Sequence, residues 1–313
     1  MIECLPTLDL TPSQIIVRTG AAQTCVVAEP NRLVLEVAMP LLAGPDFEVM
    51  ASGADFSRRG RLHLLHRPGM VAGVGLANPG LPARDAARSL YAALLEQLDG
   101  HHLQRVWNYV PGINGEVDGI ENYRAFNAGR YEAFAGYFGS DFQERLPAAS
   151  AVGTVGGGLA VAFLAGTGST RHFENPEQMA SVEYPTDYGL VPPAFARGTV
   201  VEEVAGLSWF LSGTASIKGH ATQGREIEEQ ARITFENVQI MFRRMGWPEA
   251  GAASWKIFLR HARDLPAARA ALAATFPSFA GDAMFVLADI CRSELLIEVE
   301  ATRHATLAAA LRS

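Results

Sequence analysis

The sequence predicts an α+β protein made of two copies of one module, each a mixed β-sheet with helices packed on one face. Three observations predict this class. Short β-rich runs precede the first helix, an order of helix, strand, helix, strand and strand occurs twice, and the longest weakly polar run is too short to span a membrane. With 313 residues, of which 49% are hydrophobic and 19% charged, the chain is long enough for two packed units and too apolar for disorder.

The first half of the chain is expected to begin with strands. Short β-rich runs extend to about residue 77 and are separated by Pro and Gly. Apolar residues at three- and four-residue steps then predict a helix over 83–98, which Gly100 closes. The further elements expected are a strand at 103–110, a helix over 122–138 and a strand pair within 150–165, joined as a hairpin by a tight turn at 156–158.

The second half repeats this order, which indicates an internal duplication. A helical apolar face runs over 224–244, and Gly246 ends it. The segment 105–110 resembles 254–259 in its alternation of aromatic and aliphatic residues. The other elements expected here are a strand at 255–259, a helix over 265–276, and a strand pair at 283–290 and 294–301.

The repeat divides the chain into three parts. We expect an N-terminal module at 1–165 with extra strands at its start, and a C-terminal module at 198–313. The segment 166–197 between them is rich in Pro, Asn and acidic residues. Its length predicts an ordered linker with a task of its own.

Composition and charge exclude several function classes. The formal net charge of -7, with no block of like charge, argues against nucleic acid as a partner. The three cysteines, Cys4, Cys25 and Cys291, are too far apart for a disulfide framework or a metal clip. The N-terminus lacks a secretory signal, so we expect a cytoplasmic protein. No histidine cluster has metal-ligand spacing, and no glycine-rich run has a phosphate-loop ending, so neither a metal nor a cofactor is expected.

The last strand carries the first candidate site. Side chains alternate along a strand, so Glu298 and Glu300 share one face. A carboxylate there lies either on a solvated face or in a cleft, where loss of water raises its pKa and makes it a usable general acid. A bulge or turn at Ser293 would bring Cys291 to the same pocket.

A helix carries the second candidate site. Tyr123, Asn127 and Arg130 are three and four residues apart, so they share one helix face. A hydroxyl, an amide and a guanidinium in this arrangement can hold a carboxylate. The alternative is that Arg130 pairs with Glu121 or Glu132 at the surface.

Several segments of the sequence resemble known families. The segments Gly224 to Gly246, Trp255 to His261 and Ile297 to Ala301 resemble the YjgF/RidA fold, in which a Glu on the last strand lines a small-molecule cleft. A longer series of motifs lies between about Ala83 and Arg303. The motifs are Trp107 to Asn114, Glu121 to Arg130, His172 to Gln178, Ser212 to Ser216 with Gly219 and His220, and Ile290 to Ala301. Together these motifs are similar to those of the chorismatase family.

The resemblance implies an activity and its residues. Chorismatases cleave the enolpyruvyl ether of chorismate without a metal or an organic cofactor, which gives pyruvate and either a dihydroxycyclohexadiene carboxylate or a hydroxybenzoate. By this resemblance Glu298 is the catalytic acid, and Ala215 and Cys291 stand where the family selects its product. Cys291 is also expected to be catalytic, by acting on the substrate or its intermediate. The further residues expected to bind the substrate are Tyr123, Arg130, Arg197, Thr214 and Ser216.

Several alternatives stay open at this stage. We favour 3-hydroxybenzoate, with 4-hydroxybenzoate also considered, as the ring product over the diol. A RidA-like deaminase would have a carboxylate-binding Arg fifteen residues before the strand Glu, but Ala283 stands there. The chain could also bind an aromatic acid without turnover, since a fold does not determine a function. The sequence leaves the oligomeric state open.

Overall fold

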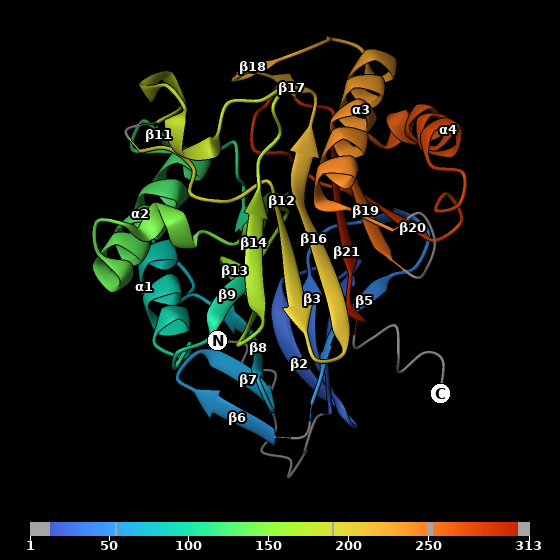
Figure 1. Cartoon of the computed structure of the whole chain (residues 1–313). Coiled ribbons are helices and arrows are strands. Elements are labelled where there is room, and N and C mark those ends of the chain that lie inside the picture. Colours follow the sequence, from blue (N-terminus) through green and yellow to red (C-terminus); the bar gives the residue numbers. More distant parts are fainter. Residues whose placement is uncertain (1–12, 54, 190, 249–252, 306–313) are drawn as a thin grey trace.

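Two large β-sheets carry helices on their outer faces, and a third, smaller sheet packs between them at one end of the molecule (Figure 1). This computed structural model describes residues 13–53, 55–189, 191–248 and 253–305. In the described part of the chain, no helix is both long and apolar enough to cross a membrane.

The first large sheet has six strands, and two helices cover its outer face. Leu90, Tyr91 and Leu94 of the first helix pack against Phe126 and Phe134 of the second and against the sheet. The strands are β6 (Asp55–Arg59), β7 (Leu62–Arg67), β8 (Met70–Leu76), β9 (His102–Pro111), β12 (Ala148–Thr154) and β13 (Ala160–Gly166), and the helices are α1 (Ala83–Leu95) and α2 (Asn122–Phe138).

The second large sheet has seven strands and is built in the same way. Its outer face packs against two helices, the longer of which ends at Gly246 in the left-handed conformation that glycine adopts without strain. The elements are β4 (Leu41–Ala43), β14 (Ser169–Phe173), β15 (Gly198–Glu203), β16 (Gly206–Ala215), β19 (Ser254–Leu259), β20 (Ala283–Leu287), β21 (Ile297–Arg303), α3 (Ile227–Met245) and α4 (Leu265–Thr275).

The order of strands confirms the predicted duplication. The first sheet has the order β12-β9-β13-β8-β7-β6, and the second has β20-β19-β21-β16-β15-β14 with β4 added beyond β20. In both sheets the first pair is parallel and the other pairs of the shared order are antiparallel. The α+β class with two equivalent modules is therefore confirmed.

The predicted hairpin within 150–165 and the predicted strand pair at 283–290 and 294–301 are both wrong. β20 and β21 do not pair with each other, because β19 lies between them, parallel to β20 and antiparallel to β21. β12 and β13 do not pair with each other, because β9 lies between them, parallel to β12 and antiparallel to β13. The loop between β12 and β13 therefore crosses the end of β9, and its Gly157 forms a bridge with Thr24. The hairpin prediction assumed that strands adjacent in sequence pair, which holds often but not always.

The extra N-terminal strands form a third sheet of order β2-β3-β1-β5. Its inner face joins a core that also contains the inner faces of both large sheets. The segment 166–197 contributes the edge strand β14 and two short 3-10 helices, while its division from the modules stays a prediction. The strands of the third sheet are β1 (Gln14–Thr19), β2 (Cys25–Glu29), β3 (Arg32–Val37) and β5 (Phe47–Ser52). Short two-residue strands complete the list: β10 (Glu116–Val117) with β11 (Ile120–Glu121), and β17 (Ile217–Lys218) with β18 (Ala221–Thr222).

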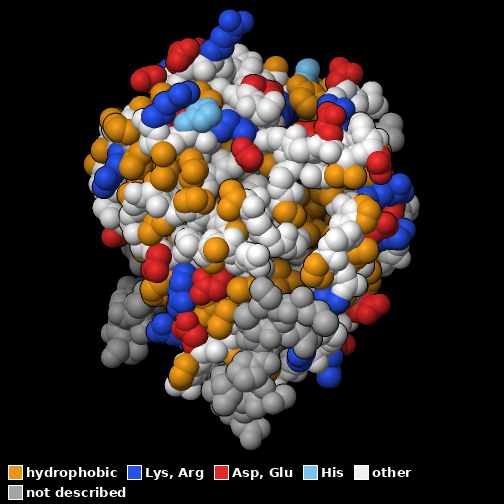
Figure 2. All heavy atoms as spheres, turned by 180° about the vertical axis from the view of Figure 1, so that it is seen from behind, with side chains coloured by type: hydrophobic (Ala, Val, Ile, Leu, Met, Phe, Trp, Pro, Cys, Tyr) orange, Lys and Arg blue, Asp and Glu red, His pale blue; other side chains and the backbone are white. Residues whose placement is uncertain are grey.

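Acidic and basic side chains are interspersed on the face shown in Figure 2. They gather there as small mixed groups and form no continuous surface of one sign. This distribution agrees with the absence of charge blocks in the sequence.

Candidate active site

A cavity of about 220 Å³ lies where the edge of β12 meets β16 and β21. One wall comes from α2 and β12, and the opposite wall comes from β16, β21 and the turn before β21. The segment that precedes β15 closes a third side. Six of the eight predicted site residues line this cavity: Tyr123, Arg130, Arg197, Ala215, Cys291 and Glu298.

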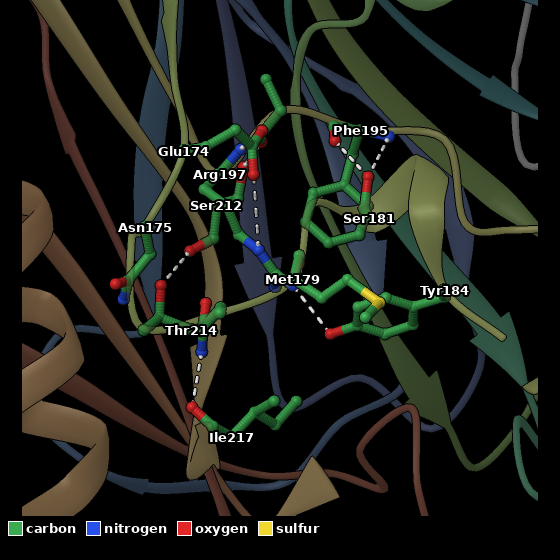
Figure 3. Close-up of polar contacts among 12 residues, drawn as sticks. Glu174, Asn175, Met179, Ser181, Tyr184, Phe195, Arg197, Ser212, Thr214 and Ile217 are labelled. Atoms are coloured by element: carbon green, nitrogen blue, oxygen red, sulfur yellow. Dashed lines mark hydrogen bonds and ion pairs between the residues drawn. The ribbon is translucent and has the colours of Figure 1, made fainter. Parts of the chain in front are cut away.

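Thr214 and Ser216 do not line the cavity. Alternation along this stretch puts Gly213, Ala215 and Ile217 on the cavity side and the two hydroxyls on the other. The Thr214 hydroxyl donates to the carbonyl oxygen of Ser212 at 2.9 Å, and Figure 3 shows the two residues side by side. The Ser216 hydroxyl donates to the carbonyl oxygen of Gln223 at 2.7 Å. Both hydroxyls therefore have structural partners.

Glu298 is buried at the bottom of the cavity. Its side chain faces inward, because Ile297 and Val299 on either side pack into the core under α3 and α4. Glu298 is 4% exposed, so the solvated-face alternative is wrong. Its Oε1 atom has no hydrogen-bond partner among the described residues. Burial, together with the negative charge of Glu300, raises the pKa of Glu298 to about 8, so the carboxyl is protonated at neutral pH.

Gly213 makes room for this carboxyl. A Cβ atom on Gly213 would lie 2.3 Å from Oε1 of Glu298 and 2.7 Å from its Cδ. The backbone of Gly213 does not have a positive φ, so this glycine is needed for space rather than for conformation. Sequence reasoning missed this role because it depends on a strand 85 residues away in the chain.

A turn before β21 brings Cys291 beside Glu298. The chain bends between Arg292 and Leu295, whose backbone atoms form a hydrogen bond of 3.1 Å. Burial, and then the charge of Glu298, raise the pKa of Cys291 to about 12. The side chain is therefore a neutral thiol at neutral pH, and it is not an activated nucleophile.

Arg130 projects from α2 into the cavity and is 2% exposed. Its Nη2 donates to Oδ1 of Asn127 at 3.0 Å, which confirms the expected shared helix face. The alternative surface pairing is wrong, since Glu132 pairs with Arg84 and Glu121 with Arg124. The Nε of Arg130 has no hydrogen-bond partner among the residues described.

Arg197 enters the cavity from the opposite side and is 4% exposed. Figure 3 shows its guanidinium beside Met179 and the phenol of Tyr184. Its Nη2 donates to the Tyr184 hydroxyl at 2.7 Å and to the carbonyl oxygen of Met179 at 3.3 Å, while its backbone N–H donates to Glu174. The segment before β15 thus holds this arginine in place.

The structure adds cavity residues that sequence reasoning missed. Arg292 lies 4.1 Å from the ring centroid of Tyr188 and 5.4 Å from that of Tyr184, at the mouth of the cavity. Tyr188 also contacts Nδ1 of His220 at 3.2 Å. In the parts of the chain that the structure describes, no group of three or more His, Cys, Asp or Glu residues could hold a metal ion.

Comparisons with known proteins agree with this geometry. A family model described as "Chorismatase FkbO/Hyg5-like, N-terminal" matches residues 53–165. The chain is 34% identical to a 3-hydroxybenzoate synthase of Streptomyces hygroscopicus, over 69% of this chain and 68% of the relative. It is 36% identical to a chorismatase of the same organism, over 69% and 66%. A crystal structure of a chorismatase superposes with a TM-score of 0.82 at 28% identity and covers 96% of both chains.

Proposed function

This chain belongs to the chorismatase family, and from that premise we propose that it cleaves the enolpyruvyl ether of chorismate to pyruvate and 3-hydroxybenzoate. The observation that carries the proposal is the protonated carboxyl of Glu298 at the bottom of a small cavity lined by arginines. The reaction needs an acid, side chains that bind the carboxylates of chorismate, and exclusion of water. The cavity has candidate residues for each of these tasks.

Glu298 is the proposed acid. Cleavage starts when a proton reaches the methylene carbon of the enol ether, which leaves an oxocarbenium ion on the neighbouring carbon. An ordinary carboxyl would be ionised near pH 7 and could not supply this proton. The raised pKa of Glu298 keeps the proton available, and the match between acid pKa and working pH favours proton transfer.

Arg130 and Arg197 are the residues proposed to bind the two carboxylates of chorismate. The two guanidinium groups come from opposite walls, one on α2 and one just before β15. Both are almost fully buried. The Nε of Arg130 has no hydrogen-bond partner among the described residues, and the Nε of Arg197 lies 3.9 Å from Oε2 of Glu174. They supply local positive charge in a protein whose net charge is -7. Tyr123 adds a phenol to the same wall as Arg130.

The product depends on which oxygen attacks after protonation. In the aromatic branch, the ring hydroxyl oxygen attacks the ring carbon that carries the ether, the bond between that carbon and the ether oxygen breaks, and pyruvate leaves with this oxygen. Loss of a ring proton then restores aromaticity, so the products have the same atoms as chorismate. In the hydrolytic branch, a water attacks and the products contain one more water. Ala215 and Cys291 border Glu298 in the cavity, and we propose that they fill the space that this water would need. The relative named 3-hydroxybenzoate synthase supports the aromatic branch.

A RidA-like deaminase is less well supported. The position where that activity would require an arginine is Ala283, which is buried against α3 and α4 on the face of the second sheet opposite to Glu298. An arginine at this position would not reach the cavity.

In the proposed division of the chain, each part contributes to the site. The module at 1–165 supplies Tyr123 and Arg130, the segment 166–197 supplies Arg197, and the module at 198–313 supplies the acid. We propose a cytoplasmic location, in which the thiols of Cys25 and Cys291 stay reduced. Neither nucleic acid nor a membrane is a proposed partner.

The test is to incubate the purified chain with chorismate, measure pyruvate by a coupled assay and identify the ring product by chromatography. We expect equal amounts of pyruvate and 3-hydroxybenzoate, and a kcat that is about 10²- to 10⁴-fold lower with Glu298→Gln. A non-aromatic diol would move the enzyme to the hydrolytic branch. The absence of pyruvate from the wild-type reaction would refute the proposal and leave a binding protein.

A further inference from the structure

A cluster of buried charges lies beside the proposed acid. Glu300 on β21 contacts two cations: its Oε2 is 2.7 Å from Nη2 of Arg105 on β9, and its Oε1 is 2.7 Å from Nζ of Lys256 on β19. Lys256 also contacts Oε2 of Glu48 on β5 at 2.8 Å. The hydroxyl of Ser150 on β12 bonds to both Glu300 and Arg105. The cluster therefore joins strands from all three sheets.

The burial of these charges costs free energy, because they lose their contact with water. The four charged side chains are each no more than 7% exposed, and ion pairs removed from water often stabilise a fold less than apolar residues would. With two cations and two carboxylates, the cluster is neutral when both Glu48 and Glu300 are ionised. A fifth charge in the same space would have no counter-ion of its own.

Glu298 is that fifth group. It is two residues from Glu300 on the same face of β21, so their carboxyls are neighbours. Lys256 and Arg105 outweigh the effect of burial and lower the pKa of Glu300, whereas burial and Glu300 raise that of Glu298. Because the two pKa values differ in this way, Glu300 is the anion of the pair and Glu298 is the acid.

The other groups that face Glu298 do not cancel this effect. Arg105 and Arg197 lower the pKa of Glu298, but Arg105 is bound to Glu300 and Arg197 to Tyr184. Cys291 in the turn before β21 and Tyr123 on α2 both have raised pKa values and are neutral at pH 7. The neighbouring residues of β16, Gly213 and Ala215, have no charge.

We propose that Glu300 is a positioning residue for the reaction: its carboxylate, fixed by Lys256 and Arg105, supplies the negative charge that keeps Glu298 in its acid form. The proposal rests on the proposed function, in which Glu298 donates the proton. It assigns the buried ion pairs a task in catalysis in addition to joining the sheets.

The test is the pH profile of kcat/KM for Glu300→Gln. Removal of the charge lowers the pKa of Glu298, so the alkaline limb moves to lower pH. We expect a shift of about one to two pH units, as for two charges on alternate residues of a strand in protein surroundings. Activity at pH 7 then falls several-fold and recovers on acidification.

Glu48→Gln is the matched control. Glu48 is also a buried carboxylate on Lys256, at nearly the same distance as Glu300, but it belongs to β5 rather than to the strand of the acid. Glu48→Gln should shift the alkaline limb of the pH profile by less than half as much as Glu300→Gln does. If Glu300→Gln does not fold, Glu300→Gln/Lys256→Met removes one charge of each sign and should shift the limb in the same direction, because Arg105 is then free to attract Glu298.

A second readout separates this proposal from the proposed function. Infrared titration of the buried carboxylic acid band, assigned by its loss in Glu298→Gln, measures the protonation of Glu298 without a substrate. A midpoint that falls in Glu300→Gln supports the proposal even if chorismate is not turned over. An unchanged midpoint, an equal loss of activity at every pH, or an equal shift in Glu48→Gln would overturn it.

Discussion

Replacement of Gly213 by alanine would displace the proposed acid while leaving its chemistry unchanged. The new Cβ would lie 2.3 Å from Oε1 and 2.7 Å from Cδ of Glu298, whereas ordinary contacts need about 3.5 Å. The carboxyl must therefore move by about 1 Å. It is the far end of a side chain that can rotate, so the fold should tolerate the change.

The expected effect is large on the rate and small on stability. A displacement of about 1 Å in a catalytic group costs on the order of 100-fold. We expect kcat/KM of Gly213→Ala, measured by pyruvate release, to fall by about that factor, with a melting temperature close to that of the wild type. Gly136→Ala is the matched control, because Gly136 lies in α2 with nothing within 4 Å of a new Cβ, and its activity should not change.

A double-mutant cycle tests the cause of the loss. Glu298→Asp shortens the side chain and should itself lower the rate, but it also draws the carboxyl back by one methylene, away from the new Cβ. The double variant Gly213→Ala/Glu298→Asp should therefore be about as active as Glu298→Asp alone. Multiplicative losses, or a kcat/KM of Gly213→Ala within about threefold of the wild type, would refute the reasoning.

Three further predictions concern the same cavity. Glu298→Gln should keep the fold and ligand binding but lower kcat by about 10²- to 10⁴-fold, the usual contribution of a general acid, and near-normal turnover would exclude this role. In the wild type, kcat/KM should fall about tenfold per pH unit above about pH 8, because the raised pKa of Glu298 keeps the active, protonated form up to that pH; a plateau to pH 10 would contradict it. Arg130→Ala should raise KM roughly 10- to 100-fold, as for a lost hydrogen bond to a charged group, with a smaller change in kcat, and an unchanged KM would show that Arg130 does not hold the substrate.

Local patterns predicted the elements well. Helix α2 has the same bounds as expected from the sequence, and β19 begins one residue before the expected strand. Pairing was harder to predict. β12 and β13 are buried along their whole length and lack an alternating pattern, so their sequence does not indicate that β9 inserts between them.

The candidate site was predictable where its residues share one element. Tyr123 and Arg130 lie on one helix face, and Glu298 follows the alternation of its strand. The burial of Glu298 was not predictable, because it depends on Ser150 and on Gly213, which come from distant strands. The alternation of β16, once its phase is known, also explains why Thr214 points away from the cavity.

The duplication of the sheets has a consequence for stoichiometry. Glu298 and Glu300 lie opposite Phe258 and Lys256 of β19, and the corresponding positions of β13, opposite Tyr109 and Trp107 of β9, are Ala160 and Ala162. Both alanines are fully buried in the apolar core between the sheets. One copy of the module thus provides the proposed acid and the other provides a wall, so a titration with a substrate analogue should saturate at one molecule per chain.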